Sequence, residues 1–207
     1  MPREPYHPFS SPYVVLPREN VDTDQIIPAR FLTTTVRDGL GRHVFHNWRY
    51  AADGTPDPEF VLNRPDAAGA RILVAGRNFG CGSSREHAVW ALMGAGFRAV
   101  VSSDFADIFR GNALGNGLLP VQVPSDALAR LLDGQPRGEL RVDLATQTLG
   151  LADGTAVHFP VPPFARHCLL HGVDELEFLL GHDIDIEAHE RRHPARVHTA
   201  PLAAEVA

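Results

Sequence analysis

The chain has 207 residues, 44% of them hydrophobic, which is enough for one well-buried core. Its formal net charge of -6 and its scattered basic residues argue against a nucleic-acid-binding surface. Two cysteines are too few for a disulfide framework, and no run approaches the roughly 20 apolar residues of a membrane span or forms the apolar core of a signal peptide. We therefore expect a cytoplasmic protein with one domain over residues 1–193 and a disordered tail over residues 194–207.

The first third of the chain predicts little regular structure. The first dozen residues are rich in proline and serine and are expected to lie on the surface, before a strand over residues 13–16. Pro28 favours a short helix directly after it, because proline suits the first turn of a helix. Residues 33–66 contain three glycines and three prolines and predict a long irregular segment. Such segments are usually functional or flexible, so this one is a candidate to close over a ligand.

Residues 71–123 alternate between strand and helix patterns. The apolar runs predict three buried strands and two intervening helices, over residues 71–76, 88–93, 97–102, 105–114 and 118–123. This order indicates an α/β fold with parallel strands and right-handed crossovers.

The last third predicts a short helix, three strands and a final helical region. Ser125 and Asp126 are suited to cap a helix that ends near residue 132. Strands are expected over residues 140–144, 147–151 and 156–159, with a turn at Asp153 and Gly154 between the last two. After Pro162 and Pro163, helical apolar spacing runs from Leu169 to Leu180.

The loop after the first of the central strands is the most informative segment. Residues 78–88 are Asn-Phe-Gly-Cys-Gly-Ser-Ser-Arg-Glu-His-Ala, and they lead from a strand into a helix. A helix start offers unpaired N–H groups and a dipole that favours an anion. Arg85 is unfavourable in that first turn unless an anion lies in front of it. The loop therefore predicts an anion site beside Ser83, Ser84 and Arg85.

Two other interpretations of this loop are open. Ser83 and Glu86 have the spacing of a capping box, which is about as probable as a binding role and compatible with it. Gly80 and Gly82, with Asp104 after the next strand, partly match a dinucleotide fingerprint. Arg85 stands where that fingerprint has its third glycine, which disfavours nucleotide binding.

Three motifs in order resemble one family. Residues 21–29, 78–88 and 111–120 resemble the swivelling domain of the aconitase superfamily. The chain length and the Arg-Phe-Leu-Thr-Thr loop at residues 30–34 most resemble the small subunits of bacterial isopropylmalate isomerases. This resemblance implies an α/β fold of layered β/β/α type with a partly parallel central sheet. It also implies a hydro-lyase that interconverts 2-isopropylmalate and 3-isopropylmalate through 2-isopropylmaleate, in leucine biosynthesis.

The same resemblance implies a cofactor and a partner. Family members use a [4Fe–4S] cluster as a Lewis acid, and such a cluster takes several cysteine thiolates. Cys81 and Cys168 are too few, so we expect no metal on this chain and the cluster on a larger partner subunit. The histidine pairs 167/171 and 189/193 have ligand spacing but no obvious third ligand, which favours solvated helix faces. Neither a nucleic acid nor a membrane is expected as a partner.

The resemblance assigns roles to residues in two of the motifs. Ser83 resembles the catalytic base, Ser84 a hydrogen-bond donor to a substrate carboxylate, and Arg85 the bidentate clamp on that carboxylate. A helix start and Arg85 together supply the positive field that a serine alkoxide needs. We interpret His87 as a packing residue.

The loop at residues 30–34 is the region where the family selects its substrate. Arg30, Leu32 and Thr33 are its candidate substrate-binding residues, and its apolar and hydroxyl-bearing character suits an isopropyl group. Asp22 and Asp24 are interpreted as turn and N-cap residues. Sister hydro-lyases acting on citraconate, dimethylmalate or homoaconitate, and a nucleotide-binding or regulatory module, remain as alternatives.

Overall fold

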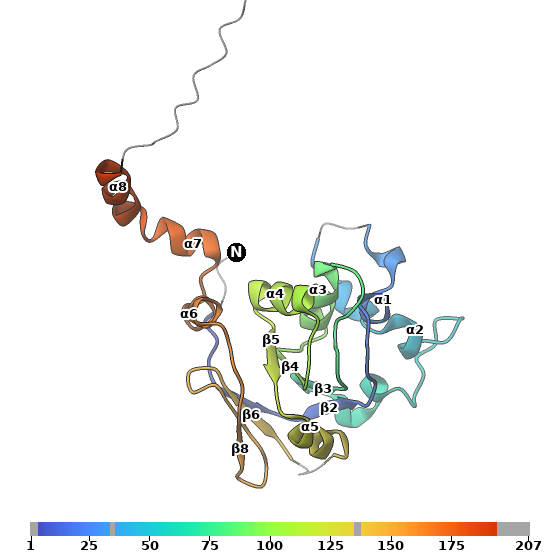
Figure 1. The fold of residues 1–207 in the computed structure, drawn as a ribbon. Coiled ribbons are helices and arrows are strands. Elements are labelled where there is room, and N and C mark those ends of the chain that lie inside the picture. Colours follow the sequence, from blue (N-terminus) through green and yellow to red (C-terminus); the bar gives the residue numbers. More distant parts are fainter. Residues whose placement is uncertain (1–3, 34–35, 135–137, 194–207) are drawn as a thin grey trace, which may run out of the picture.

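A four-stranded parallel sheet forms the centre of the protein (Figure 1). The computed structural model describes residues 4–33, 36–134 and 138–193. The sheet order is β2-β3-β4-β5, and every neighbouring pair is parallel. The strands are β2 (Tyr13–Leu16), β3 (Ile72–Ala75), β4 (Ala99–Ser102) and β5 (Leu119–Gln122). The predicted strands and their parallel pairing are confirmed, whereas the predicted tail over residues 194–207 lies outside the described residues.

A second, antiparallel sheet lies beside the first. Its order is β1-β6-β7-β8, formed by β1 (Phe9–Ser11), β6 (Leu140–Asp143), β7 (Thr148–Gly150) and β8 (Ala156–His158). The Asp153 carboxylate accepts the Thr155 N–H at 2.9 Å in the predicted turn between the last two strands. The predicted surface position of the first dozen residues is wrong for Phe9 and Ser11, which are both buried.

Apolar clusters on both sides of the parallel sheet make it the middle layer. Leu73 and Val100 belong to a cluster on one side, and Ile72 and Val74 belong to a cluster on the other. This alternation is expected of strands that are buried on both faces. The first cluster is covered by α1 (Thr23–Ile26), α2 (His46–Arg49), α3 (Glu86–Gly94) and α4 (Asp107–Asn116). The second lies between the parallel sheet, the antiparallel sheet and α5 (Ser125–Leu132), so the predicted β/β/α layering is confirmed.

The segment between β2 and β3 is irregular, as predicted, but it is anchored in the core. It contains the single turns η1 (Ala29–Phe31), η2 (Leu40–His43), η3 (Val61–Asn63) and η4 (Pro65–Ala67). Pro28 is the N-cap of the first of these, which confirms the predicted short helix. Leu40, Val44, Phe45 and Phe60 are buried in the first cluster. Buried side chains of this size hold residues 40–60 on the domain.

The C-terminal region is helical, as predicted, but much of its apolar face is uncovered. It consists of α6 (Pro163–His171), α7 (Glu175–Leu180) and α8 (Asp183–Arg192). Leu169 is buried, whereas Leu176, Leu179 and Leu180 are more than half exposed. We call residues 174–193 the C-terminal arm, because α7 and α8 extend away from the two sheets (Figure 1). None of the helices in the described ranges is long and apolar enough to cross a membrane.

Candidate active site

The candidate site lies at the carboxyl ends of the parallel strands, where ligands commonly bind in such sheets. Residues 76–82 continue from β3 and are held by backbone hydrogen bonds on both sides. On one side the Gly80 N–H donates to the Val21 carbonyl at 2.8 Å. On the other side the Phe79 N–H donates to the Asp104 carbonyl at 3.1 Å. The loop is therefore clamped between the segments that follow β2 and β4.

Both glycines of the loop have left-handed backbone conformations. Gly80 has a φ of 78° and Gly82 a φ of 88°, which other residues rarely adopt. A Cβ atom at Gly80 would also lie 2.2 Å from Cγ of Phe109 in α4. The Gly-Cys-Gly sequence therefore satisfies the backbone turn and the close packing on α4, and it needs no nucleotide to explain it.

Gly80→Ala is expected to lower the free energy of unfolding by about 2–5 kcal/mol. Left-handed backbone strain contributes about 1–2 kcal/mol and overpacking about 1–3 kcal/mol. Gly154→Ala is the matched control, since its φ of 84° is similar but an added Cβ would contact nothing within 4 Å. Urea unfolding of both variants measures the difference. Equal losses in the two variants would contradict the close packing at Phe109.

The helix that follows the loop begins later than the capping box requires. α3 starts at Glu86, with Arg85 as an N-cap whose side chain makes no capping hydrogen bond. The predicted Ser83 cap is wrong, because the Ser83 carbonyl accepts hydrogen bonds from the Thr23 hydroxyl at 3.0 Å and the Arg85 N–H at 2.8 Å. These contacts hold residues 83–85 outside the helix. The Glu86 carboxylate instead accepts from the Asn116 amide at 2.7 Å.

The predicted anion-binding side chains come together at this helix start. Ser83 and Ser84 are exposed, and within the described residues their hydroxyls form no hydrogen bond. The Arg85 side chain is only 18% exposed, and its Nη1 forms an ion pair with Oδ1 of Asp24. One edge of the guanidinium is therefore held by the protein, while the two hydroxyls face solvent beside it.

The contact between Asp24 and Arg85 was not predicted. Asp22 is the N-cap of α1, as expected, because its carboxylate accepts the Gln25 N–H at 2.8 Å. The same interpretation is wrong for Asp24, whose carboxylate points to Arg85. The hydrogen bond from Arg85, with a smaller contribution from the Ala29 N–H, lowers the pKa of Asp24 below its usual value. Side chains two positions apart on a helical turn point in different directions. This spacing could have indicated that Asp22 and Asp24 have different partners.

The second predicted group, at residues 30–33, directly follows α1. Nη2 of Arg30 donates to Oδ1 of Asn47 at 2.7 Å, and its guanidinium lies 4.7 Å from the Phe31 ring centroid. Leu32 is half-buried and Thr33 is exposed. Within the described residues, neither a hydrogen bond nor an ion pair joins Arg30 to residues 83–85. The connection between the two groups is α1, which holds Asp24.

An aromatic cluster beside Arg30 was missed. The ring of Phe31 stacks on His43 at 3.9 Å and meets His46 edge-on at 4.8 Å. Burial, followed by the neighbouring Arg42, lowers the pKa of His43. Burial, followed by Arg30, lowers the pKa of His46. Both imidazoles therefore favour the neutral form. The aromatic cluster beside residues 30–33 is thus less polar than two histidines would indicate.

Asn116 connects the first turn of α3 to the end of α4. It is 5% exposed. Its amide nitrogen donates to Glu86 and its oxygen accepts from Nε1 of Trp90 at 2.9 Å. The ring of His87 lies 4.7 Å from Trp90, which agrees with the packing role predicted for that histidine. This network was missed because it joins residues about 30 positions apart.

The cysteines of this chain are poor candidates for a cluster site. Neither Cys81 nor Cys168 forms a disulfide. Burial, followed by the negative charge of Asp22, raises the pKa of Cys81 and disfavours the thiolate that a metal requires. Over residues 4–33, 36–134 and 138–193, no group of three or more His, Cys, Asp or Glu side chains is placed to hold a metal ion. The rings of the two histidine pairs 167/171 and 189/193 are exposed and stack at 4.2 Å and 4.3 Å.

Comparisons with known proteins agree with this fold and site. The family model described as the aconitase C-terminal domain matches residues 11–126. A solved structure of 3-isopropylmalate dehydratase from Methanocaldococcus jannaschii shares the fold, with a TM-score of 0.63, 24% identity, and coverage of 88% of this chain and 99% of that one. The architecture is therefore that of an aconitase-type C-terminal domain.

Closer relatives define the family within this class. The 3-isopropylmalate dehydratase small subunit of Anaeromyxobacter dehalogenans (strain 2CP-C) is 62% identical over 187 residues, covering 90% of this chain and 97% of the relative. The protein of the same name from Roseiflexus sp. (strain RS-1) is 56% identical over 199 residues, covering 95% and 98%. The chain belongs to the family of 3-isopropylmalate dehydratase small subunits, which confirms the resemblance found in the sequence.

Proposed function

We propose that this chain is the small subunit of a hydro-lyase that interconverts 2-isopropylmalate and 3-isopropylmalate through 2-isopropylmaleate in leucine biosynthesis. The observation that carries the proposal is the start of α3, where two exposed serine hydroxyls lie beside a guanidinium fixed by Asp24. A substituted malate offers the carboxylates and the acidic C–H that such a group can bind and deprotonate. The names of the relatives agree with this chemistry.

Ser83 is the proposed base. Its oxygen takes the proton from the carbon beside a carboxylate, and returns a proton when water is added back. A serine hydroxyl is a weak base unless its alkoxide is stabilised. The N-terminus of α3 and the positive charge of Arg85 both favour the anion. Exclusion of water when a partner covers these exposed residues would strengthen that field.

Arg85 and Ser84 are the proposed carboxylate-binding residues. A guanidinium has five N–H donors in a fixed plane, so one edge can bind Asp24 while another binds a substrate carboxylate. Ser84 adds a neutral donor next to it. Because Asp24 fixes the orientation of Arg85, the clamp is in place before substrate arrives, and less entropy is lost on binding.

Residues 30–33 are the proposed selectivity region. Leu32 and the neutral Phe31–His43–His46 cluster offer an apolar environment, and Thr33 offers a hydroxyl. Burial of an isopropyl group is worth about 0.8 kcal/mol per carbon. Arg30 lies at the edge of this region, where Asn47 orients it.

We propose that the Lewis acid is a [4Fe–4S] cluster held by a large partner subunit, since the small-subunit names of the relatives imply such a partner. When bound there, the cluster supplies an iron that polarises the leaving hydroxyl. The raised pKa of Cys81 disfavours the thiolate that a cluster ligand needs, and within the described residues no group of three or more His, Cys, Asp or Glu side chains is placed to hold a metal ion. Neither cysteine forms a disulfide, which supports a reducing compartment, and we propose the cytoplasm.

The test of this function compares the chain alone with the reconstituted pair. The purified chain should show no isopropylmalate turnover, and addition of the large subunit of the same organism with its cluster should restore it. Citraconate, dimethylmalate and homoaconitate serve as competing substrates. Turnover by the chain alone would contradict the shared active site. A pair that prefers another substrate would refute the assigned one.

Asp24→Asn is expected to raise KM about threefold to tenfold with little change in kcat, because Arg85 keeps its charge but loses a fixed orientation. The pKa of Asp24 is lowered in the folded chain, so the ion pair is intact above the usual aspartate pKa of about 3.9 and is lost as the pH falls through the lowered value. Steady-state kinetics at neutral pH therefore compare a formed pair with an absent one. An unchanged KM would contradict the positioning role.

A further inference from the structure

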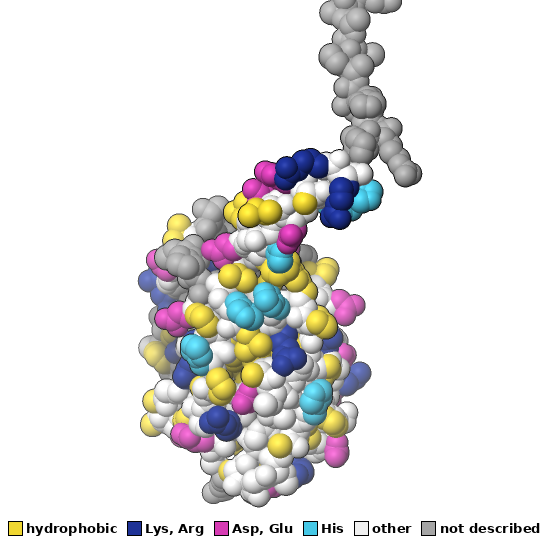
Figure 2. Space-filling view, turned by 90° about the vertical axis from the view of Figure 1, so that its left-hand side faces the viewer, with side chains coloured by type: hydrophobic (Ala, Val, Ile, Leu, Met, Phe, Trp, Pro, Cys, Tyr) yellow, Lys and Arg dark blue, Asp and Glu magenta, His cyan; other side chains and the backbone are white. Residues whose placement is uncertain are grey.

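The C-terminal arm carries apolar side chains that are exposed among the residues the structure describes. Leu176 and Leu180 are each 64% exposed and Ile184 is 81% exposed. Within the described residues, neither α7 nor α8 contains a buried side chain. Figure 2 shows hydrophobic side chains exposed on the arm, above the body of the domain. Grouped exposure of this kind marks interaction surfaces in soluble proteins.

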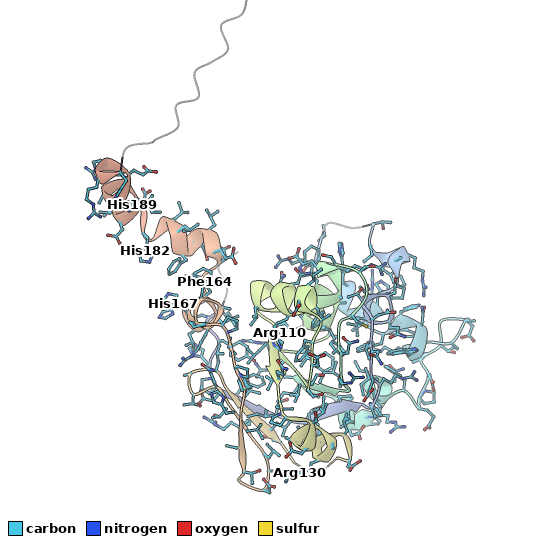
Figure 3. All side chains as sticks on the ribbon, viewed as in Figure 1. Arg110, Arg130, Phe164, His167, His182 and His189 are labelled. Atoms are coloured by element: carbon cyan, nitrogen blue, oxygen red, sulfur yellow. The ribbon has the colours of Figure 1, made fainter. Side chains whose placement is uncertain are left out.

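The arm is nevertheless fixed where it leaves the domain. The ring of Phe178 lies 5.0 Å from Phe164 and 5.4 Å from His167, both on α6 at the base of the arm (Figure 3). Asp174 and Glu177 form a capping box, with hydrogen bonds of 2.8 Å and 2.9 Å. Helices of six and ten residues are marginal on their own in water. Local contacts thus orient the arm, but its exposed leucine and isoleucine side chains are not buried by any other part of the described chain.

A cavity lies at the base of the arm. It has a volume of about 540 Å³ and runs between α4 and the base of the arm. Its lining includes Phe164 and Leu176, and also Glu86, which follows Arg85 directly in the chain. The base of the arm thus shares a cavity with the first residue of α3.

The charge of the arm argues against a second copy of this chain as the occupant. The arm carries seven acidic residues and two arginines: Asp174, Glu175, Glu177, Asp183, Asp185, Glu187, Glu190, Arg191 and Arg192. A two-fold contact places the same surface on both sides of the interface. Two acidic rims would then face each other, and such juxtaposition is unfavourable. The arm instead fits an apolar groove with a basic rim.

We propose that the apolar face of the C-terminal arm docks on the large, cluster-bearing subunit, in an apolar groove bordered by basic residues. This inference rests on the proposed function, because that function requires the partner. The arm anchors the partner at a distance from the reacting atoms, so it contributes to assembly and not to the chemical step. Leu176 and Leu180 have the i, i+4 spacing of anchors in helix-in-groove binding, and Ile184 adds an exposed apolar side chain from α8.

The test compares two triple variants of the full chain. The combination Leu176→Ser, Leu180→Ser and Ile184→Ser removes the apolar anchors, while Leu176→Met, Leu180→Met and Ile184→Val keeps them. The serine variant should bind the large subunit about 10- to 100-fold more weakly than the wild-type chain, the loss expected when several interface anchors are removed. The methionine and valine variant should stay within about threefold. Calorimetric titration measures both, and circular dichroism checks that the helices remain.

Activity measurements distinguish a failure of the docking proposal from a failure of the proposed function. At saturating large subunit, the serine variant should reach a kcat within about twofold of wild type, because residues 83–85 are unchanged. Equal affinity of the two variants for the large subunit would overturn the docking surface. A wild-type chain that self-associates through these residues, while the serine variant is monomeric, would identify a second copy as the occupant and also overturn it. A pair that assembles through the arm but does not act on isopropylmalate would refute only the function.

Discussion

Replacing Ser83 by alanine is expected to lower kcat of the reconstituted enzyme by about 10²- to 10⁴-fold, the contribution typical of a positioned general base. The backbone at this position should not move, because the Ser83 carbonyl is held by Thr23 at 3.0 Å and by Arg85 at 2.8 Å. The side chain is exposed and its hydroxyl forms no hydrogen bond within the described residues, so the free energy of unfolding should change by less than about 0.5 kcal/mol. KM should change little.

Ser84→Ala is the matched control for this experiment. It removes another exposed hydroxyl one position away. Because Ser84 is proposed to bind the substrate carboxylate, the substitution should raise KM while kcat falls less than about tenfold. Steady-state rates in both directions distinguish the two variants. A Ser83→Ala enzyme that keeps more than a tenth of the wild-type kcat would show that another group removes the proton.

Replacing Arg85 by lysine is expected to lower kcat/KM about 10²- to 10³-fold, which corresponds to roughly 3–4 kcal/mol of lost interaction with the substrate. Lysine keeps the charge but cannot bind Asp24 on one edge and a carboxylate on another, because an ammonium group has no planar fork. Because lysine is also long and positively charged, the positive electrostatic field at the start of α3 is largely retained. The defect should therefore reflect geometry more than charge.

The same variant should leave the fold intact. The Asp24 side chain is 54% exposed, and exposed ion pairs contribute about 0–1 kcal/mol to stability. Urea unfolding of the Arg85→Lys chain checks this separately from its kinetics. Normal kcat/KM in a folded variant would refute the clamp, whereas an unfolded variant would show that Arg85 has a structural role larger than its contacts indicate.

Much of the central fold could be predicted because its elements carry strong local patterns. β3 and β4 are uninterrupted apolar runs, as expected for strands covered on both faces. β1 was missed because it has only three residues, in a segment rich in proline and serine. It exists as a strand through pairing with β6, from which it is separated by most of the chain. Local propensity carries no information about such a partner.

In the candidate site, too, some features follow from the local sequence and others depend on residues far apart in the chain. Grouping of Ser83, Ser84 and Arg85 follows from their adjacency, and their roles in catalysis remain predictions. The ion pair of Arg85 with Asp24 joins residues 61 positions apart, so it depends on the tertiary fold. The capping box was wrong because α3 begins at Glu86 with Arg85 at its N-cap, so Ser83 lies before the helix, where its carbonyl accepts from the Thr23 hydroxyl.

The position of Asp24 has a consequence for how specificity can change within this fold. Its carboxylate binds Arg85, and it lies in α1 (Thr23–Ile26), which precedes residues 30–33 in the chain. In the proposed function, Arg85 binds the carboxylate common to all malates and residues 30–33 contact the variable substituent, so the helix that carries Asp24 links the two proposed regions. Free-energy changes from substitutions in the two regions should not add, since neighbours that share a partner are coupled. A new substrate preference is therefore reached more readily by changing both regions together than by changing either one in turn.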